Sequence, residues 1–212
     1  MITTRQLALL KWVYNEYQVQ KMRELPNLII QKFLFFYECF SKVENDIYSF
    51  DGLKGYVNGP VFSEVYGAIR YHKAELNREI AQEIDYEVNV ARATKAFFIT
   101  RSLGNELSDF THDLNIWRSQ EPYIKRGYQQ IELYDRDFSR EDARMCRELL
   151  SLYTLDYIQQ VKLIEYNGRV FIIDKDEEIK EEYYDVFFEI ANDKTFKNPI
   201  YVDIHEGELY FE

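Results

Sequence analysis

Cysteine and histidine are scarce in this 212-residue chain, which contains two cysteines and three histidines. It has no Cys-x-x-Cys pair, no His-x-x-x-His pair and no glycine-rich phosphate-binding loop. The sequence therefore lacks the common signatures of metal, redox and nucleotide-binding sites. Cys39 and Cys146 lie among apolar neighbours in segments with helical spacing. We expect them to be buried thiols in a reducing compartment rather than a disulfide.

Long apolar runs are also missing. No stretch approaches the roughly 18 uncharged apolar residues of a membrane span, so the sequence predicts neither a span nor a membrane partner. The segment after Met1 shows no apolar stretch with a small-residue cleavage site, which predicts that there is no secretory signal. These observations favour a cytoplasmic location.

Apolar and aromatic residues are plentiful instead. Hydrophobic residues make up 46% of the chain and aromatic residues 17%, which is enough to build a packed core and argues against disorder of the whole chain. The length fits one medium domain, or one domain with a small appendage.

Acidic residues are concentrated near the carboxyl end. The net charge is −11, and residues 156–212 hold 15 acidic and 6 basic side chains. Such a surface repels phosphate backbones, which argues against a nucleic-acid partner for this segment, and it attracts a basic protein. The alternative is a solvated face that only keeps the protein soluble. Within the segment, Glu177, Glu178, Glu181 and Glu182 are the candidate partner-binding carboxylates.

Apolar spacing predicts a helical body over residues 1–155. We expect a first helix over 3–24 and a second, central helix from Pro26 to about Val43, with the proline in its first turn. Residues 58–60 should form a turn that leads directly into a third helix. Further helices are expected over 76–102, with an interruption near Asp85, and over 106–117. Ser139 and Asp142 predict a capping box at the start of another helix.

The pattern changes near residue 156. Residues 161–173 read as two strands around Asn167-Gly168, a dipeptide that accepts the two positive φ angles of a tight hairpin turn. A helix is expected over 177–191, followed by a second hairpin around Glu206-Gly207. The predicted fold class is α+β: a mainly helical body with a short strand segment (residues 1–155), and an acidic strand-strand-helix-strand-strand extension (residues 156–212) docked on it.

Two separated motifs stand out within the body. The first joins an apolar helix that contains Lys32-Phe33-Leu34-Phe35-Phe36-Tyr37 to Tyr56-Val57-Asn58-Gly59-Pro60-Val61, with Val65-Tyr66 in the next helix. The second is Leu107-Ser108-Asp109-Phe110-Thr111-His112, followed five residues after the histidine by Trp117. Together they resemble the Panacea antitoxin family, which includes SocA-like antitoxins that act as proteolytic adaptors. The resemblance covers about residues 5–120. Asn58 and Phe110 depart from the family's usual pattern.

The resemblance implies a non-enzymatic, cofactor-free protein of bacterial or prophage origin. Such a protein neutralises a cognate toxin by direct binding and could deliver it to an ATP-dependent protease. The motif residues Gly59, Pro60, Thr111, His112 and Trp117 then either contact the partner or hold the fold. We expect Thr111 to bond to a carbonyl four residues back. We expect His112 to donate to a backbone carbonyl at the helix end, and Trp117 to cover that contact.

Two other functions remain open from the sequence. A phage-encoded inhibitor of a host defence protein would share the acidic surface and the absence of catalytic motifs. A metal-dependent hydrolase could use Asp109 and Asp113, which lie four residues apart beside His112. The alternative to a metal site is that these carboxylates form a solvated polar helix face, since no further ligand with metal-site spacing accompanies them.

Overall fold

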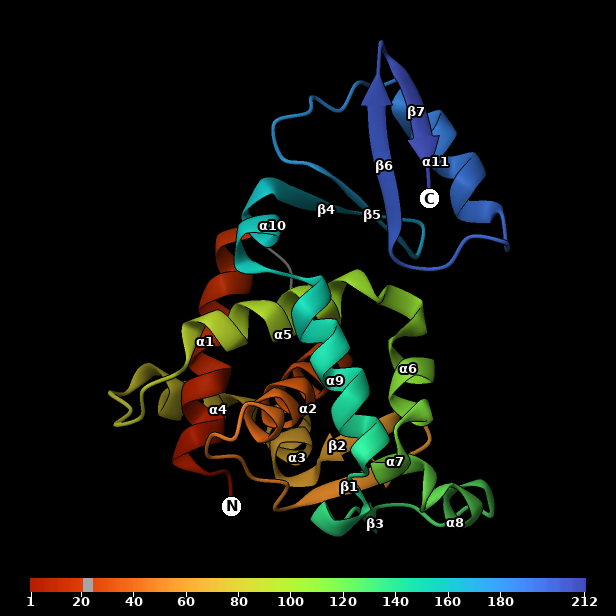
Figure 1. Cartoon of the computed structure of the whole chain (residues 1–212). Helices are drawn as coiled ribbons and strands as arrows, with labels where there is room; N and C mark the ends of the chain where they lie inside the picture. Colours follow the sequence, from red (N-terminus) through yellow and green to blue (C-terminus); the bar gives the residue numbers. More distant parts are fainter. Residues whose placement is uncertain (21–24) are drawn as a thin grey trace.

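The computed structural model describes residues 1–20 and 25–212, and this part of the chain is a mixed α+β structure with two small sheets (Figure 1). Its α-helices are α1 (Thr4–Gln20), α2 (Asn27–Val43), α3 (Ser63–Tyr71), α4 (Lys73–Ala81), α5 (Val90–Ser102), α6 (Leu107–Asp113), α7 (Asn115–Arg118), α8 (Glu121–Lys125), α9 (Arg140–Leu152), α10 (Leu155–Gln160) and α11 (Tyr183–Asn192). Its strands are β1 (Leu53–Tyr56), β2 (Gly59–Phe62), β3 (Ile131–Glu132), β4 (Val161–Tyr166), β5 (Arg169–Asp174), β6 (Ile200–His205) and β7 (Glu208–Phe211). The predicted fold class is confirmed.

Helix α2 forms the centre of the body. Its side chains are apolar on most sides, and residues from Phe33 to Phe40 are almost completely buried. Figure 1 shows α1, α5 and α9 arranged around it. The helix begins at Asn27, so Pro26 precedes the first turn instead of lying in it. The predicted first helix is described from Thr4 to Gln20, and residues 21–24 lie outside the described part.

The capping box at α9 is confirmed and has a second role. The Ser139 hydroxyl accepts from the Asp142 amide, and the Asp142 carboxylate accepts from the Ser139 amide, both at 3.1 Å. The same buried carboxylate accepts from the backbone amides of Asn115 and Ile116 at 2.7 and 3.0 Å. One side chain therefore caps α9 and the start of α7, and it joins two segments that are distant in sequence.

The prediction that residues 58–60 lead straight into a helix is wrong. The turn lies at Val57 and Asn58, residues 59–62 form β2, and α3 begins only at Ser63. Strand β2 pairs antiparallel with β1, which places Gly55 opposite Pro60. The sheet order is β2-β1-β3. Pro60 is tolerated because β2 is an edge strand, where a missing amide donor costs little.

Two longer helices that the sequence predicts are broken. Residues 82–89 separate α4 from α5, which confirms the interruption expected near Asp85. The helix expected over 106–117 is instead α6 and α7, divided at Leu114, whose backbone is extended at φ −70° and ψ 132°. The break directs α7 back toward β1.

The carboxyl-terminal segment forms a four-stranded sheet in the order β4-β5-β6-β7, in which β5 and β6 are parallel and the other neighbours antiparallel. Both predicted hairpin turns are present, each with two positive φ angles: 47° and 78° at Asn167-Gly168, and 53° and 88° at Glu206-Gly207. The helix expected over 177–191 begins only at Tyr183, so residues 177–182 are not helical. No helix in the described part of the chain has the length and apolar character needed to cross a bilayer.

Successive side chains of strand β5 pack alternately into two hydrophobic cores. Phe171 and Ile173 pack with Phe187 of α11 in a small cluster of the extension, whereas Ile172 joins the main core of the body. Tyr153 and Tyr201 share a hydroxyl–hydroxyl hydrogen bond of 2.9 Å across the same contact. In Figure 1 the sheet lies beside α5.

We predict that a chain ending at residue 155 stays compact and helical but becomes less stable. Ile172 is only 2% exposed, and its loss would leave a cavity at the end of the main core. Circular dichroism and thermal unfolding of the truncated chain test this prediction. An unfolded or insoluble product would show that residues 156–212 are part of the folding unit, and a division at about 155 would be wrong.

Candidate functional site

The two sequence motifs meet at one buried junction, which we call the motif junction and define by Lys32, Gly59, Thr111, His112 and Trp117. Lys32 extends from α2, Gly59 opens β2, Thr111 and His112 lie on α6, and Trp117 lies on α7. Lys32 is 0% exposed. Its amino group donates to the Asn58 carbonyl and to the Thr111 hydroxyl, both at 2.7 Å. Three separate segments are thereby held by one side chain.

The hairpin approaches Lys32 so closely that only glycine fits at position 59. Its φ is +102°, a conformation that side chains rarely adopt. A Cβ atom at this position would lie 2.0 Å from Lys32 Nζ and 2.6 Å from Thr111 Oγ1. Position 59 must therefore be glycine because the side chains of Lys32 and Thr111, which come from other segments, leave no room for a Cβ atom. The Thr111 hydroxyl itself donates to the Ser108 carbonyl at 2.9 Å, three residues back and not four as predicted.

His112 and Trp117 hold the other side of the hairpin. Their rings stack with centroids 3.9 Å apart and planes inclined by 23°. The Trp117 indole donates to the Tyr56 carbonyl at 3.0 Å, and the imidazole of His112 makes a hydrogen bond to the backbone of Val57. The predicted backbone contact of His112 beside Trp117 is present, but its predicted place at the helix end is wrong. The bonded backbone group belongs to the β1–β2 turn.

Burial controls the charge state of the junction. Removal from water disfavours the ammonium form and lowers the pKa of Lys32 to about 7. Burial also lowers the pKa of His112, and the nearby charge of Lys32 lowers it further. In the described part of the chain, His112 Nε2 is buried without a hydrogen-bond partner. The Lys32 amine is fully enclosed and cannot meet a substrate, so the geometry favours an architectural role over nucleophilic chemistry.

Lys32 is the junction residue that the sequence did not single out as a site residue. The sequence does mark Lys32 as unusual, because it is a lone charge directly before the apolar run from Phe33 to Tyr37. The carbonyls of Tyr56 and Asn58, which accept the bonds of Trp117 and Lys32, give no sequence signal. Pro60 lies beside the junction in β2.

The acidic candidates lie elsewhere. Residues 177–182 connect β5 to α11, and Glu178, Glu181 and Glu182 are exposed, whereas Glu177 is partly covered. The Lys162 ammonium donates to the carbonyls of Lys175 and Glu177, which holds this irregular segment against β4. Figure 1 places the extension at the end of the molecule opposite β1 and α7. The structure therefore does not bring the acidic residues and the motif junction together.

Asp109 and Asp113 are both exposed on α6. Among the described residues, no group of three or more histidine, cysteine, aspartate and glutamate side chains is placed to hold a metal ion. Cys39 and Cys146 are free and buried. Comparison with known proteins found no family model, no curated protein and no solved structure that matches this chain.

Proposed function

We propose that this chain is a cytoplasmic antitoxin-type protein of the Panacea family that neutralises a cognate protein toxin by stoichiometric binding, without catalysis. The observation that carries the proposal is the convergence of both motifs on a single junction. Residues that are far apart in sequence, Lys32, Gly59 and Thr111, depend on one another sterically and through hydrogen bonds. This mutual dependence explains why the motifs would occur together.

The junction serves binding by fixing an exposed hairpin. Its own side chains are largely buried, so the partner contacts must come from the surface that it positions. Val57 at the hairpin tip is 67% exposed. Helix α8 packs on β1, where Ile124 lies against Gly55, and it carries the half-exposed Tyr123. Aromatic side chains on a rigid support are typical centres of binding energy.

The acidic extension supports a basic partner. Eight carboxylates lie between Asp174 and Glu189, against Lys175 and Lys180 alone. Exposed charges are screened over about 8 Å at physiological ionic strength, so this field acts mainly on the approach of the partner and weakens with salt. The affinity itself comes from the packed contacts.

We therefore predict that replacing Glu177, Glu178, Glu181 and Glu182 by Gln slows association with a basic partner, by about tenfold at low salt, while the fold is retained. Stopped-flow or surface-based kinetics measure the rate. A matched control replaces four carboxylates on another surface, Glu79, Glu83, Asp85 and Glu87, by their amides. Equal slowing in both variants would mean that only net charge matters, and no slowing in either would make the extension a solubility feature.

Co-expression in a bacterial host tests the function itself. The candidate partner is a small, basic, growth-arresting protein encoded beside this chain. We expect co-expression to relieve the arrest and the two proteins to purify together. If relief also requires an ATP-dependent protease, the chain acts as an adaptor. Relief without any complex, in hosts with or without the protease, would contradict the proposal.

A further inference from the structure

Helix α11 carries four aromatic side chains and turns two of them toward solvent. Tyr183 and Phe187 are buried in the small core of the extension, where Phe187 stacks on Phe171 with ring centroids 4.6 Å apart. Tyr184 and Phe188, in contrast, are 41% and 53% exposed. They are four positions apart, so their side chains are neighbours on one side of the helix. In Figure 1, α11 lies at the upper right, away from the helices of the body.

The exposed aromatic pair has a fixed support. The Tyr184 ring contacts the ring of Tyr166 in β4 at a centroid distance of 5.8 Å, and it meets the Phe187 ring edge-on at 5.9 Å. The Asn192 side chain donates to the Phe188 carbonyl at 2.8 Å, which closes the last turn of the helix. Side chains on such a support lose little conformational freedom when a partner binds, which suits them to anchor it.

Carboxylates border the aromatic pair. Asp185 and Glu189 are exposed and four residues apart, so they form a row along the helix next to the two rings. We call Tyr184, Asp185, Phe188 and Glu189 the α11 face. Residues 177–192 hold six carboxylates against one lysine. The α11 face is therefore an aromatic patch in a negative field, which attracts a cationic partner.

The stability of α11 explains only part of this pattern. Asp185 lies in the first turn, where its carboxylate offsets the positive end of the helix dipole. Glu189 lies in the last turn, where a carboxylate faces the negative end of the dipole, and that turn, which the structure describes in full, holds no basic residue. Phe188 leaves half of its surface in water and adds little to the core. A contribution to binding accounts for both residues.

The chemistry of the α11 face favours arginine over other cationic groups. A guanidinium group stacks on aromatic rings, and its forked donors bind carboxylates through two hydrogen bonds, whereas a lysine ammonium acts as a point charge. The body already contains this combination, because the Arg5 guanidinium lies over the Tyr37 ring at 5.1 Å and pairs with Glu38 at 2.7 Å. The carboxylates of the face repel phosphate groups, which disfavours nucleic acids and anionic lipids.

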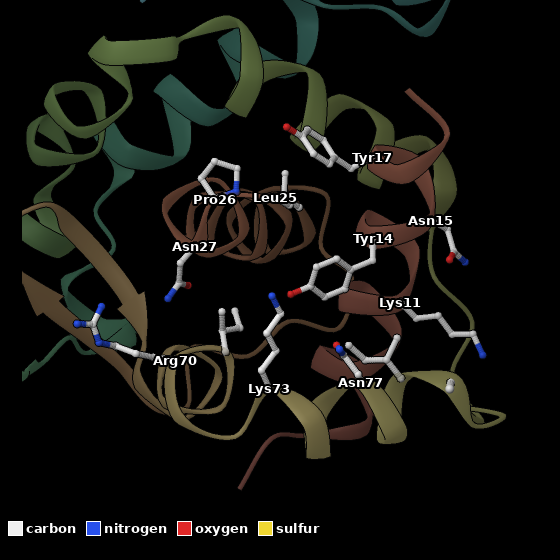
Figure 2. A pocket seen from close by; sticks show the side chains of 13 residues that line it. Lys11, Tyr14, Asn15, Tyr17, Leu25, Pro26, Asn27, Arg70, Lys73 and Asn77 are labelled. Carbon is white, nitrogen blue, oxygen red and sulfur yellow. The ribbon is translucent and has the colours of Figure 1, made fainter. Parts of the chain in front are cut away.

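We propose that the α11 face docks an arginine-bearing segment of the protein partner, with guanidinium groups held between the exposed rings and the carboxylates of Asp185 and Glu189. This inference rests on the proposed function, since it takes the occupant to be a basic protein, and it adds a contact region away from the hairpin. The face is also separate from the cleft of about 810 Å³ between α1, the start of α2, α3 and α4 that Figure 2 shows, because none of the described residues that line this cleft belongs to α11.

Calorimetric titration of the full chain with a peptide of alternating arginine and alanine tests the proposal, and a lysine peptide of the same length and charge is the second probe. We expect the arginine peptide to bind saturably below about 1 mM, and to bind about threefold or more tightly than the lysine peptide. The variant Tyr184→Gln/Phe188→Gln keeps the net charge. It should weaken binding of the arginine peptide by about fivefold or more, since the cation–π contacts of two rings are lost.

A matched control is Tyr71→Gln/Tyr128→Gln, which removes two rings that are 71% and 62% exposed outside the extension. It should leave the affinity for the arginine peptide unchanged. Circular dichroism verifies that both variants are folded, which is expected because all four side chains are exposed. Absence of saturable binding, equal affinity for the two peptides, or equal affinity of the two variants would each overturn the proposal.

The peptide titration does not use the toxin, so its outcome is independent of the co-expression test. Relief of growth arrest by a chain that does not bind the arginine peptide would reject docking at the α11 face and leave the proposed function standing. Specific peptide binding by a chain that relieves no arrest would reject the proposed function and leave the arginine-binding face standing.

Discussion

Raising the pH from 7 to 9 is expected to increase the free energy of unfolding of the wild-type chain by about 2 kcal/mol more than that of a Lys32→Met variant. The pKa of Lys32 falls from its usual 10.5 to about 7 on burial. Between these values the unfolded chain keeps a proton on this lysine that the folded chain has lost. The unfolded state therefore binds more protons, and stability rises with pH across this window.

Urea unfolding of both proteins at several pH values measures the difference, and all titrating groups that the two chains share cancel to first order. Methionine nearly matches the length of the lysine stem but cannot be charged. Below about pH 7 the two stability curves should run parallel, because Lys32 is then protonated in both states. Parallel curves from pH 7 to pH 9 would mean that Lys32 keeps an ordinary pKa and that the junction is open to water.

Replacing Gly59 by Ala is expected to destabilise the fold by about 3–5 kcal/mol, from backbone strain and overpacking together. The added Cβ would lie 2.0 Å from Lys32 Nζ, at a residue whose φ is +102°. Relief requires the buried lysine to move away from the Asn58 carbonyl and the Thr111 hydroxyl. The loss should appear in urea unfolding as a lower midpoint with an unchanged slope.

Gly52→Ala is the matched control. Gly52 also has a positive φ, +72°, but an added Cβ would meet no atom within 4 Å. It should therefore cost only the backbone strain, about 1 kcal/mol. Similar losses at both glycines would contradict the close approach of the hairpin to Lys32, and with it the interdependence of the motifs.

Features set by a few neighbouring residues could be predicted from the sequence. The capping box of Ser139 and Asp142 and the turns at Asn167-Gly168 and Glu206-Gly207 depend on local hydrogen bonds and on local φ angles. The burial of α2 follows from its apolar surface alone. These predictions are confirmed because no distant segment had to be placed first.

Features that depend on distant partners were missed. Residues 59–62 form a strand because β1 is available to pair with them, a contact that helical spacing in Val61 and Phe62 does not reveal. Residues 177–182 have helical spacing as well. They remain irregular because four glutamates in this segment repel one another. In addition, the Lys162 ammonium of β4 donates a hydrogen bond to the backbone carbonyl of Glu177.

The candidate site was predictable as a set of residues but not as a structure. The motifs named Gly59, Thr111, His112 and Trp117, yet the role of Lys32 requires knowing that α2, the hairpin and α6 meet at one point.

Stoichiometric titration of the proposed partner, a toxin encoded beside this chain, tests the central claim most directly. Purified chain is added stepwise to a fixed amount of the toxin, in the absence of any protease, and the remaining toxic activity is measured. Binding without catalysis predicts that activity falls linearly and reaches its minimum at a fixed molar ratio, and that it returns when the complex is dissociated. Permanent loss of all toxin activity at a small fraction of that ratio would show turnover and would contradict the account.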